Sequence, residues 1–100
     1  MIPMNRAHQT YASGQVMRSQ TGTVLTYYFN DGMIKAQGDY IDGRMQGRWI
    51  FNKKSGFLWQ VGYFDEDGKQ HSDWIVYKPD GTIQDHKYFV HGKRSYRQRT

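Results

Sequence analysis

The chain has 100 residues and no cysteine, which limits it to one domain and excludes disulfides and thiolate metal sites. Hydrophobic residues make up 37% and aromatic residues 16%, so a thin aromatic core is feasible but a deep catalytic cavity is hard to build. Residues 1–22 lack the apolar run of a secretion signal, and no stretch approaches the ~18 apolar residues of a membrane span, so we predict a cytoplasmic protein.

The formal charge of +5 is unevenly distributed along the chain. Residues 1–22 contribute +2, residues 23–86 contribute −2 and residues 87–100 contribute +5, which together give the total. Four side chains of this basic end are candidate anion-binding groups, for nucleic-acid phosphates or anionic lipid: Lys93, Arg94, Arg97 and Arg99. The alternative is a solvated terminus without a ligand.

In chain order, residues 1–8 show no periodicity and form a leader. Residues 11–16 then resemble a worn copy of residues 29–34, because both have an aromatic residue three places before a glycine and an aliphatic residue two places after it. We predict a short strand at 15–19 and a turn at 21–22. A degenerate first unit is typical of the terminal cap of a repeat array.

From residue 23 onward, segments rich in β-branched and aromatic residues alternate with turns that contain glycine. Turn signals recur every ~8–12 residues, which is too close for helices and typical of an antiparallel β meander. The predicted strands are 24–29, 33–41, a strand that includes 47–52, 57–64, 72–77 and 83–90. The predicted turns are 30–32, 42–43, 53–56, 65–68, 79–81 and 91–92.

The strands belong to a repeat. Residues 49–56, WIFNKKSG, return as residues 74–81, WIVYKPDG, and residues 25–32, LTYYFNDG, keep the spacing without the tryptophan. The period is 74 − 49 = 25 between tryptophans. A fixed period of this size indicates a repeat architecture, in which each unit is one supersecondary element. Trp49 and Trp74 are therefore expected in the shared core.

The second half of each unit carries a family likeness. Residues 38–49, GDYIDGRMQGRW, resemble the G-x-Y-x-x-G-x-x-x-G-x-W core of MORN-variant repeats, as found in YwqK-like bacterial proteins. The second copy has one extra turn residue and places Ser72 and Asp73 where Gly47 and Arg48 stand. The third copy begins with Lys87 in place of the first glycine and stops before the tryptophan.

This resemblance implies an all-β fold: an elongated, twisted antiparallel β-hairpin ribbon, MORN-like, with about three repeats plus a degenerate N-terminal cap. The predicted segments are a leader and cap strand over 1–22, the repeat domain over 23–94 and a basic, disordered tail over 95–100. For function, it implies a scaffold or interaction module, sometimes tied to membrane lipids, and YwqK-like proteins are often labelled antitoxins. No binding residue is carried over from the family.

Strict alternation along the strands predicts which side chains share a face. Six apolar positions of the return strands coincide when the units are aligned, and we assign them to the core: Ile34, Leu58, Ile83, Tyr40, Phe64 and Phe89. The opposite face is apolar only in the middle unit, at Phe57, Trp59, Val61 and Tyr63. These four residues are the candidate interface with a partner or a second copy, unless the leader covers them.

No motif specifies a reaction. Residues 71–73 contain the letters of a hydrolase triad, but neighbours on a strand point to opposite faces. The acidic turn at 65–68 fails the calcium-loop spacing, because Gln70 and Val76 occupy the required positions. The histidines show no ligand spacing, and phosphate-binding glycine loops are absent from the sequence.

We therefore predict a protein that is not an enzyme and has no cofactor. The favoured function is that of a protein–protein interaction or scaffold module. An antitoxin-like protein would be one form of such a module. The alternative is binding of an anionic surface, lipid or nucleic acid, through the basic tail. A small-molecule groove lined by aromatic residues stays open as a third interpretation.

Overall fold

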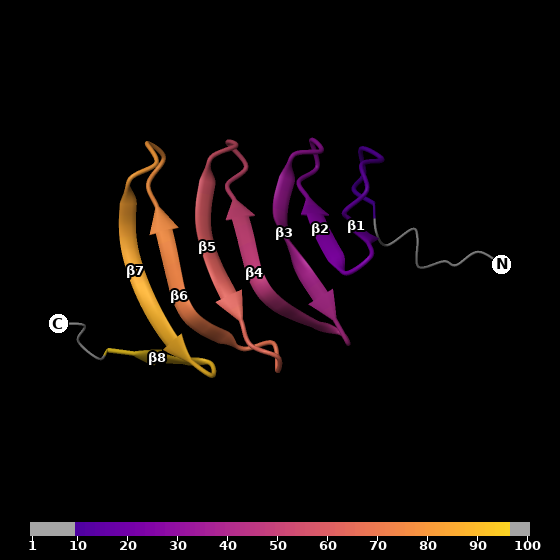
Figure 1. Cartoon of the computed structure of the whole chain (residues 1–100). Helices are drawn as coiled ribbons and strands as arrows, with labels where there is room; N and C mark the ends of the chain where they lie inside the picture. Colours follow the sequence, from indigo (N-terminus) through magenta and orange to yellow (C-terminus); the bar gives the residue numbers. More distant parts are fainter. Residues whose placement is uncertain (1–9, 97–100) are drawn as a thin grey trace.

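The computed structural model describes residues 10–96, which form a single open sheet of eight antiparallel strands in sequence order (Figure 1). This range contains no helix, and the predicted all-β hairpin ribbon is confirmed. The strands are β1 Arg18–Thr21, β2 Val24–Tyr28, β3 Ile34–Ile41, β4 Arg44–Asn52, β5 Leu58–Phe64, β6 Gln70–Tyr77, β7 Ile83–Val90 and β8 Lys93–Ser95. The sequence pattern gave no indication of β8, whose residues are polar.

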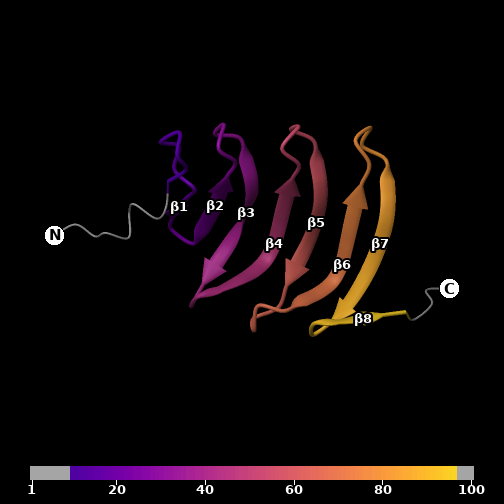
Figure 2. The same cartoon turned by 180° about the vertical axis from the view of Figure 1, so that it is seen from behind.

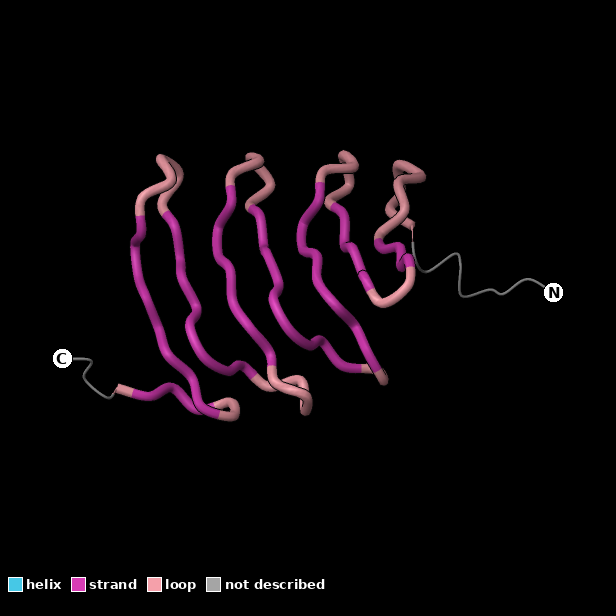
Figure 3. Tube along the Cα trace, in the orientation of Figure 1, coloured by secondary structure: helices cyan, strands magenta, loops and turns pink. Residues whose placement is uncertain are grey.

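The connections gather at the two ends of the strands (Figure 3), and five of them use one turn. In each turn, the backbone N–H of the first residue donates to the carbonyl of the fifth residue. The fourth residue is a glycine, and its N–H donates to the carbonyl of the first residue. That glycine has a φ of +79° to +102°, which only glycine adopts easily. The turn at Tyr11 has the same two hydrogen bonds as the turn at Phe29, so the predicted resemblance between the cap and the repeat is confirmed.

Trp49 and Trp74 each lie flat on a glycine of the preceding strand. A Cβ placed on Gly38 would lie 2.3 Å from Cγ of Trp49, and a Cβ on Gly62 would lie 2.1 Å from Cδ2 of Trp74. Each indole Nε1 donates to the backbone carbonyl that follows its glycine, at 2.9 Å, to Asp39 and Tyr63 respectively. The first glycine and the last tryptophan of the repeat motif are thus one packing unit.

The core is a continuous layer of rings on one side of the sheet, here called the tryptophan face. Trp49 has no exposed surface and Trp74 is 3% exposed, as predicted for the core of the repeat. Neighbouring ring centroids lie 5.1–6.4 Å apart, in stacked, tilted and edge-on pairs that each favour association. The ladder consists of Tyr27, Trp49, Phe51, Phe64, Trp74 and Phe89.

A bulge near the start of each return strand changes the predicted faces. Tyr27 pairs with Ala36 and Tyr28 with Ile34, so Lys35 is an extra residue. Trp59 and Gln84 are the extra residues at the equivalent places in β5 and β7. One extra residue moves everything before it to the other face.

The predicted core was therefore half right. Tyr40 and Phe64 pack on the core cluster and Phe89 packs on Trp74, as expected. The assignment of Ile34, Leu58 and Ile83 to that face was wrong. Their Cα partners place them on the opposite side, where Leu58 is 38% exposed and Ile83 is 57% exposed.

We predict that Gly62→Ala destabilises the fold by about 1–3 kcal/mol, because the new methyl group would overlap the Trp74 indole. Chemical denaturation followed by tryptophan fluorescence measures the effect. The matched control is Lys87→Ala, at the equivalent position of the last unit, where Trp74 lies on the preceding strand but the following strand β8 carries no tryptophan. Equal stability of Gly62→Ala and the parent would contradict the packing role of the glycine.

Ser72 gives a prediction of opposite sign. Its φ is +66°, close to the +70° of Gly47 at the equivalent place one repeat earlier. Ser72→Gly should stabilise the protein by about 0.5–1 kcal/mol, because relief of backbone strain outweighs the added freedom of the unfolded chain. Gly47→Ser is the reciprocal variant and should lose stability. Thermal melts that rank the two variants in the reverse order would refute this account.

Candidate functional site

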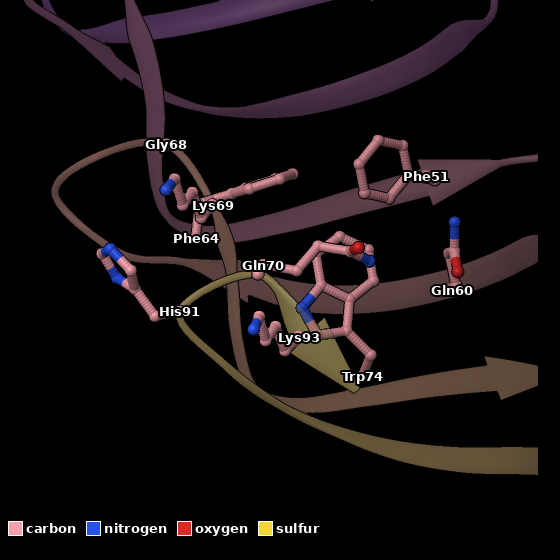
Figure 4. Close-up of a pocket in the computed structure, with 10 residues that line it drawn as sticks. Phe51, Gln60, Phe64, Gly68, Lys69, Gln70, Trp74, His91 and Lys93 are labelled. Carbon is pink, nitrogen blue, oxygen red and sulfur yellow. The ribbon is translucent and has the colours of Figure 1, made fainter. Parts of the chain in front are cut away.

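Within the described residues, the tryptophan face has at least two depressions. The first, here called the lysine-rimmed hollow, measures about 440 Å³. Its lining comes from β2 to β5 and from the β2–β3 and β4–β5 turns: Tyr27, Phe29, Lys35, Ala36, Met45, Phe51, Asn52, Lys53, Lys54 and Trp59. The second, here called the His91 groove, measures about 710 Å³ and is more open. It is lined by Phe51, Gln60, Phe64, Gly68, Lys69, Gln70, Trp74, His91, Gly92 and Lys93 (Figure 4).

The four residues predicted to share an apolar face do not do so. Val61 pairs with Ile50 and Ile75, and Tyr63 pairs with Arg48 and His71, on the side opposite the tryptophans. Trp59, in the bulge, lines the lysine-rimmed hollow instead. Phe57 precedes β5, and its carbonyl accepts the N–H of Lys53 in the turn. The prediction of a single stripe was therefore wrong, because it assumed a strand without a bulge.

The side opposite the tryptophans, here called the aliphatic face, has an uncharged central band. One row of successive Cα partners crosses the sheet through Ser19, Thr26, Gln37, Ile50, Val61, Ile75 and His86. Beside it lie the pairs Tyr28–Ile34, Asn52–Leu58 and Tyr77–Ile83. Neither set contains Asp, Glu, Lys or Arg. Val61 and Tyr63 remain on this face, and Leu58 joins them.

The candidate anion-binding side chains are separated. Lys93 and Arg94 lie in β8, which pairs with β7 at the edge of the sheet (Figure 2). Lys93 and Lys69 both line the His91 groove near Trp74 (Figure 4), and the Arg94 guanidinium lies 4.8 Å from the Tyr96 ring centroid. Arg97 and Arg99 lie outside the described residues.

A histidine–aspartate cluster joins two neighbouring turns at one end of the sheet. His91 Nδ1 lies 2.6 Å from Asp65 Oδ2, and His91 Nε2 lies 3.4 Å from Asp67 Oδ2. The backbone N–H of His91 donates to His71 Nδ1 at 3.3 Å. The donor atoms of Asp65, Asp67 and His91 lie within 4.8 Å of one another, the spacing of metal ligands, but they also satisfy one another. At a second place, His86 Nε2 lies 2.8 Å from Asp73 Oδ1.

The sequence reasoning missed this cluster, although a signal was present. Residues 65 and 91 begin equivalent turns of successive units, which lie side by side in a sheet whose strands follow the sequence order. Gly68 and Gly92 mark the stacking of these turns, because Cβ atoms there would meet the side chains of Arg44 and Lys69. Polar side chains in equivalent turns of successive units are therefore expected to lie close enough to pair.

The Asp65 carboxylate is held in its ionised form mainly by its own turn. The backbone N–H of Lys69 is the largest cause that lowers the pKa of Asp65 below its ordinary value of 3.8, and the N–H of Asp67 and the His91 ring add to it. The hydroxyl and N–H of Thr82 likewise lower the pKa of Asp80. Both carboxylates fix the turns that follow them.

Comparisons with models of known protein families, with curated proteins and with solved structures found no match to this chain. The resemblance to MORN-variant repeats therefore rests on the residues of the chain alone. Within residues 10–96, no helix has the length and apolar character that crossing a membrane requires.

The turn that contains Asp65 predicts a pH effect on stability. Since the pKa of Asp65 is lowered in the folded state, its contribution is present above pH 3.8 and is lost as the pH falls through the lower folded value. Asp65→Asn should melt at a lower temperature than the parent at neutral pH and approach it below pH 3.8. Melting curves recorded across this range test the expectation. Two parallel profiles would contradict it.

Proposed function

We propose that this chain is a non-catalytic protein–protein interaction module whose contact surface is the aliphatic face. The observation that carries the proposal is the central band of that face, which has no Asp, Glu, Lys or Arg, on a sheet with one layer. Sheets usually bury an apolar face against another layer, and burial contributes ~25 cal/mol per Å². Leu58, Ile83 and Tyr63 remain partly exposed in the single chain. Depletion of charge is also typical of the cores of protein interfaces.

The occupant that we favour is a second copy of the chain. A two-fold contact uses one patch twice and is the commonest form of oligomer. Two copies that each carry a charge of +5 repel one another in general, but the central band places no formal charge of Asp, Glu, Lys or Arg at the contact. Rows of Ile50, Val61 and Ile75 from two sheets would then pack as the inner faces of a sandwich.

Three observations support a binding rather than a catalytic role. Two of the largest rings of the tryptophan face, Trp49 and Trp74, are buried in the core. His86 and His91 are each paired with a carboxylate. The His86 and Asp73 side chains are about half exposed, so the pair faces water rather than an enclosed site. The antitoxin-like role implied by the family resemblance would be one form of such a module.

The alternative, binding of an anionic surface, has one observation in its favour: Lys69 and Lys93 both line the His91 groove. Such binding would weaken steeply with salt and depend on Lys93 and Arg94. Binding through the aliphatic face would depend little on salt.

The test of the module is the double variant Leu58→Glu with Ile83→Glu, at two partly exposed positions of the band. Sedimentation should give a dimer for the parent and a monomer for the variant, while the β circular dichroism spectrum is retained. The matched control is Met33→Glu, an apolar residue that is 52% exposed but precedes β3. A parent that is monomeric at every concentration would reject the second copy as occupant, and a double variant that stays dimeric would reject the face.

A further inference from the structure

We propose that the lysine-rimmed hollow binds a small organic anion that has one acidic group on a flat apolar body. The hollow lies on the tryptophan face, so this inference does not depend on the function proposed for the aliphatic face. Its volume, about 440 Å³, falls within the ~300–1,000 Å³ range typical of small-molecule pockets. That size suits one or two fused rings rather than a polymer.

The walls of the hollow are aromatic rings whose surfaces are only partly covered by the core. Tyr27, Phe51 and Trp59 are only half buried in the described structure, in contrast to Trp49. Phe29 closes one side, and Ala36 and Met45 also contribute to the lining. Aromatic side chains prefer offset-stacked or edge-on contacts with other rings, so a planar body fits this surface better than a flexible chain.

The rim supplies three positive charges. Lys53 Nζ lies 4.1 Å from the centroid of the Trp59 ring, and Lys35 Nζ lies 5.8 Å from that of Phe29. Lys54 Nζ donates to the neutral side-chain oxygen of Asn30 at 2.5 Å. All three ion pairs found within residues 10–96 join a histidine to an aspartate, so no carboxylate there compensates these lysines.

Two residues of the bulges line the hollow, and the last unit lacks the equivalents of several lining residues. Lys35 and Trp59 are the extra residues of successive return strands, and both therefore turn toward the tryptophan-face hollow that they line. One repeat later, the equivalent of Trp59 is Gln84, and the equivalents of Lys53 and Lys54 are Lys78 and Pro79. The last unit therefore lacks both the ring and the pair of lysines. It provides an internal comparison for the experiment.

The experiment compares two probes with the same apolar body. Anilinonaphthalene sulfonate carries one negative charge, and N-phenylnaphthylamine carries none. Titrations followed by probe fluorescence should show tighter binding of the sulfonate to the full chain. The double variant Lys35→Gln with Lys53→Gln should weaken sulfonate binding about tenfold and leave the neutral probe unchanged. Trp59→Leu should weaken both probes, with circular dichroism as the check on folding.

The matched control is Lys78→Gln with Arg48→Gln, which removes the same charge away from the hollow and should leave sulfonate binding unchanged. The proposal fails if this control weakens binding as much as the rim variant, or if the neutral probe binds as tightly as the sulfonate. A competition experiment distinguishes a planar ligand from a flexible one: naphthalene sulfonate should displace the probe more readily than octane sulfonate. The reverse order would reject the proposal that the hollow prefers a planar apolar body.

Discussion

The contact between an indole ring and a glycine of the neighbouring strand determines most of this structure. A single sheet has no second layer to enclose its core, so a large side chain must lie flat on the backbone to escape water. Only glycine leaves room for this, as Gly38 does for Trp49 and Gly62 does for Trp74. The buried indole N–H then needs an acceptor, and the next carbonyl provides it. Packing and hydrogen bonding are therefore satisfied by one pair of residues per unit.

The same contact is missing from the last described unit. In the last unit Lys87 replaces the glycine, and β8 is three residues long and polar. A lysine stem and the Arg94 side chain tolerate water, whereas another tryptophan would need a following strand to shield it. At the other end, the cap keeps the turn at Tyr11 but pairs through a single bridge, Thr10 with Val16.

The sequence was sufficient to predict the strands and turns, but not to predict which side chains lie on each face of the sheet. Turn glycines and β-branched runs located most strands, and β7 was predicted to the residue. The faces of Ile34, Leu58 and Ile83 depended on strict alternation, which the bulges at Lys35, Trp59 and Gln84 interrupt. A bulge arises from the match between turn and strand twist, and no residue type marks it here. The sequence left open a small-molecule groove lined by aromatic residues, but it did not locate the lysine-rimmed hollow, for the same reason.

Strand order in this sheet is identical to sequence order, and each strand forms its backbone pairing only with its neighbours. All contacts that build the sheet therefore join segments that are close along the chain, which gives a low contact order and predicts fast folding for an all-β protein. Such an array behaves as a one-dimensional chain of coupled units. Folding can begin at any hairpin and spread outward. Thermal unfolding should proceed inward from β1 and β8. The central strands β4 to β6, which carry Trp49 and Trp74, should therefore exchange their amide hydrogens most slowly.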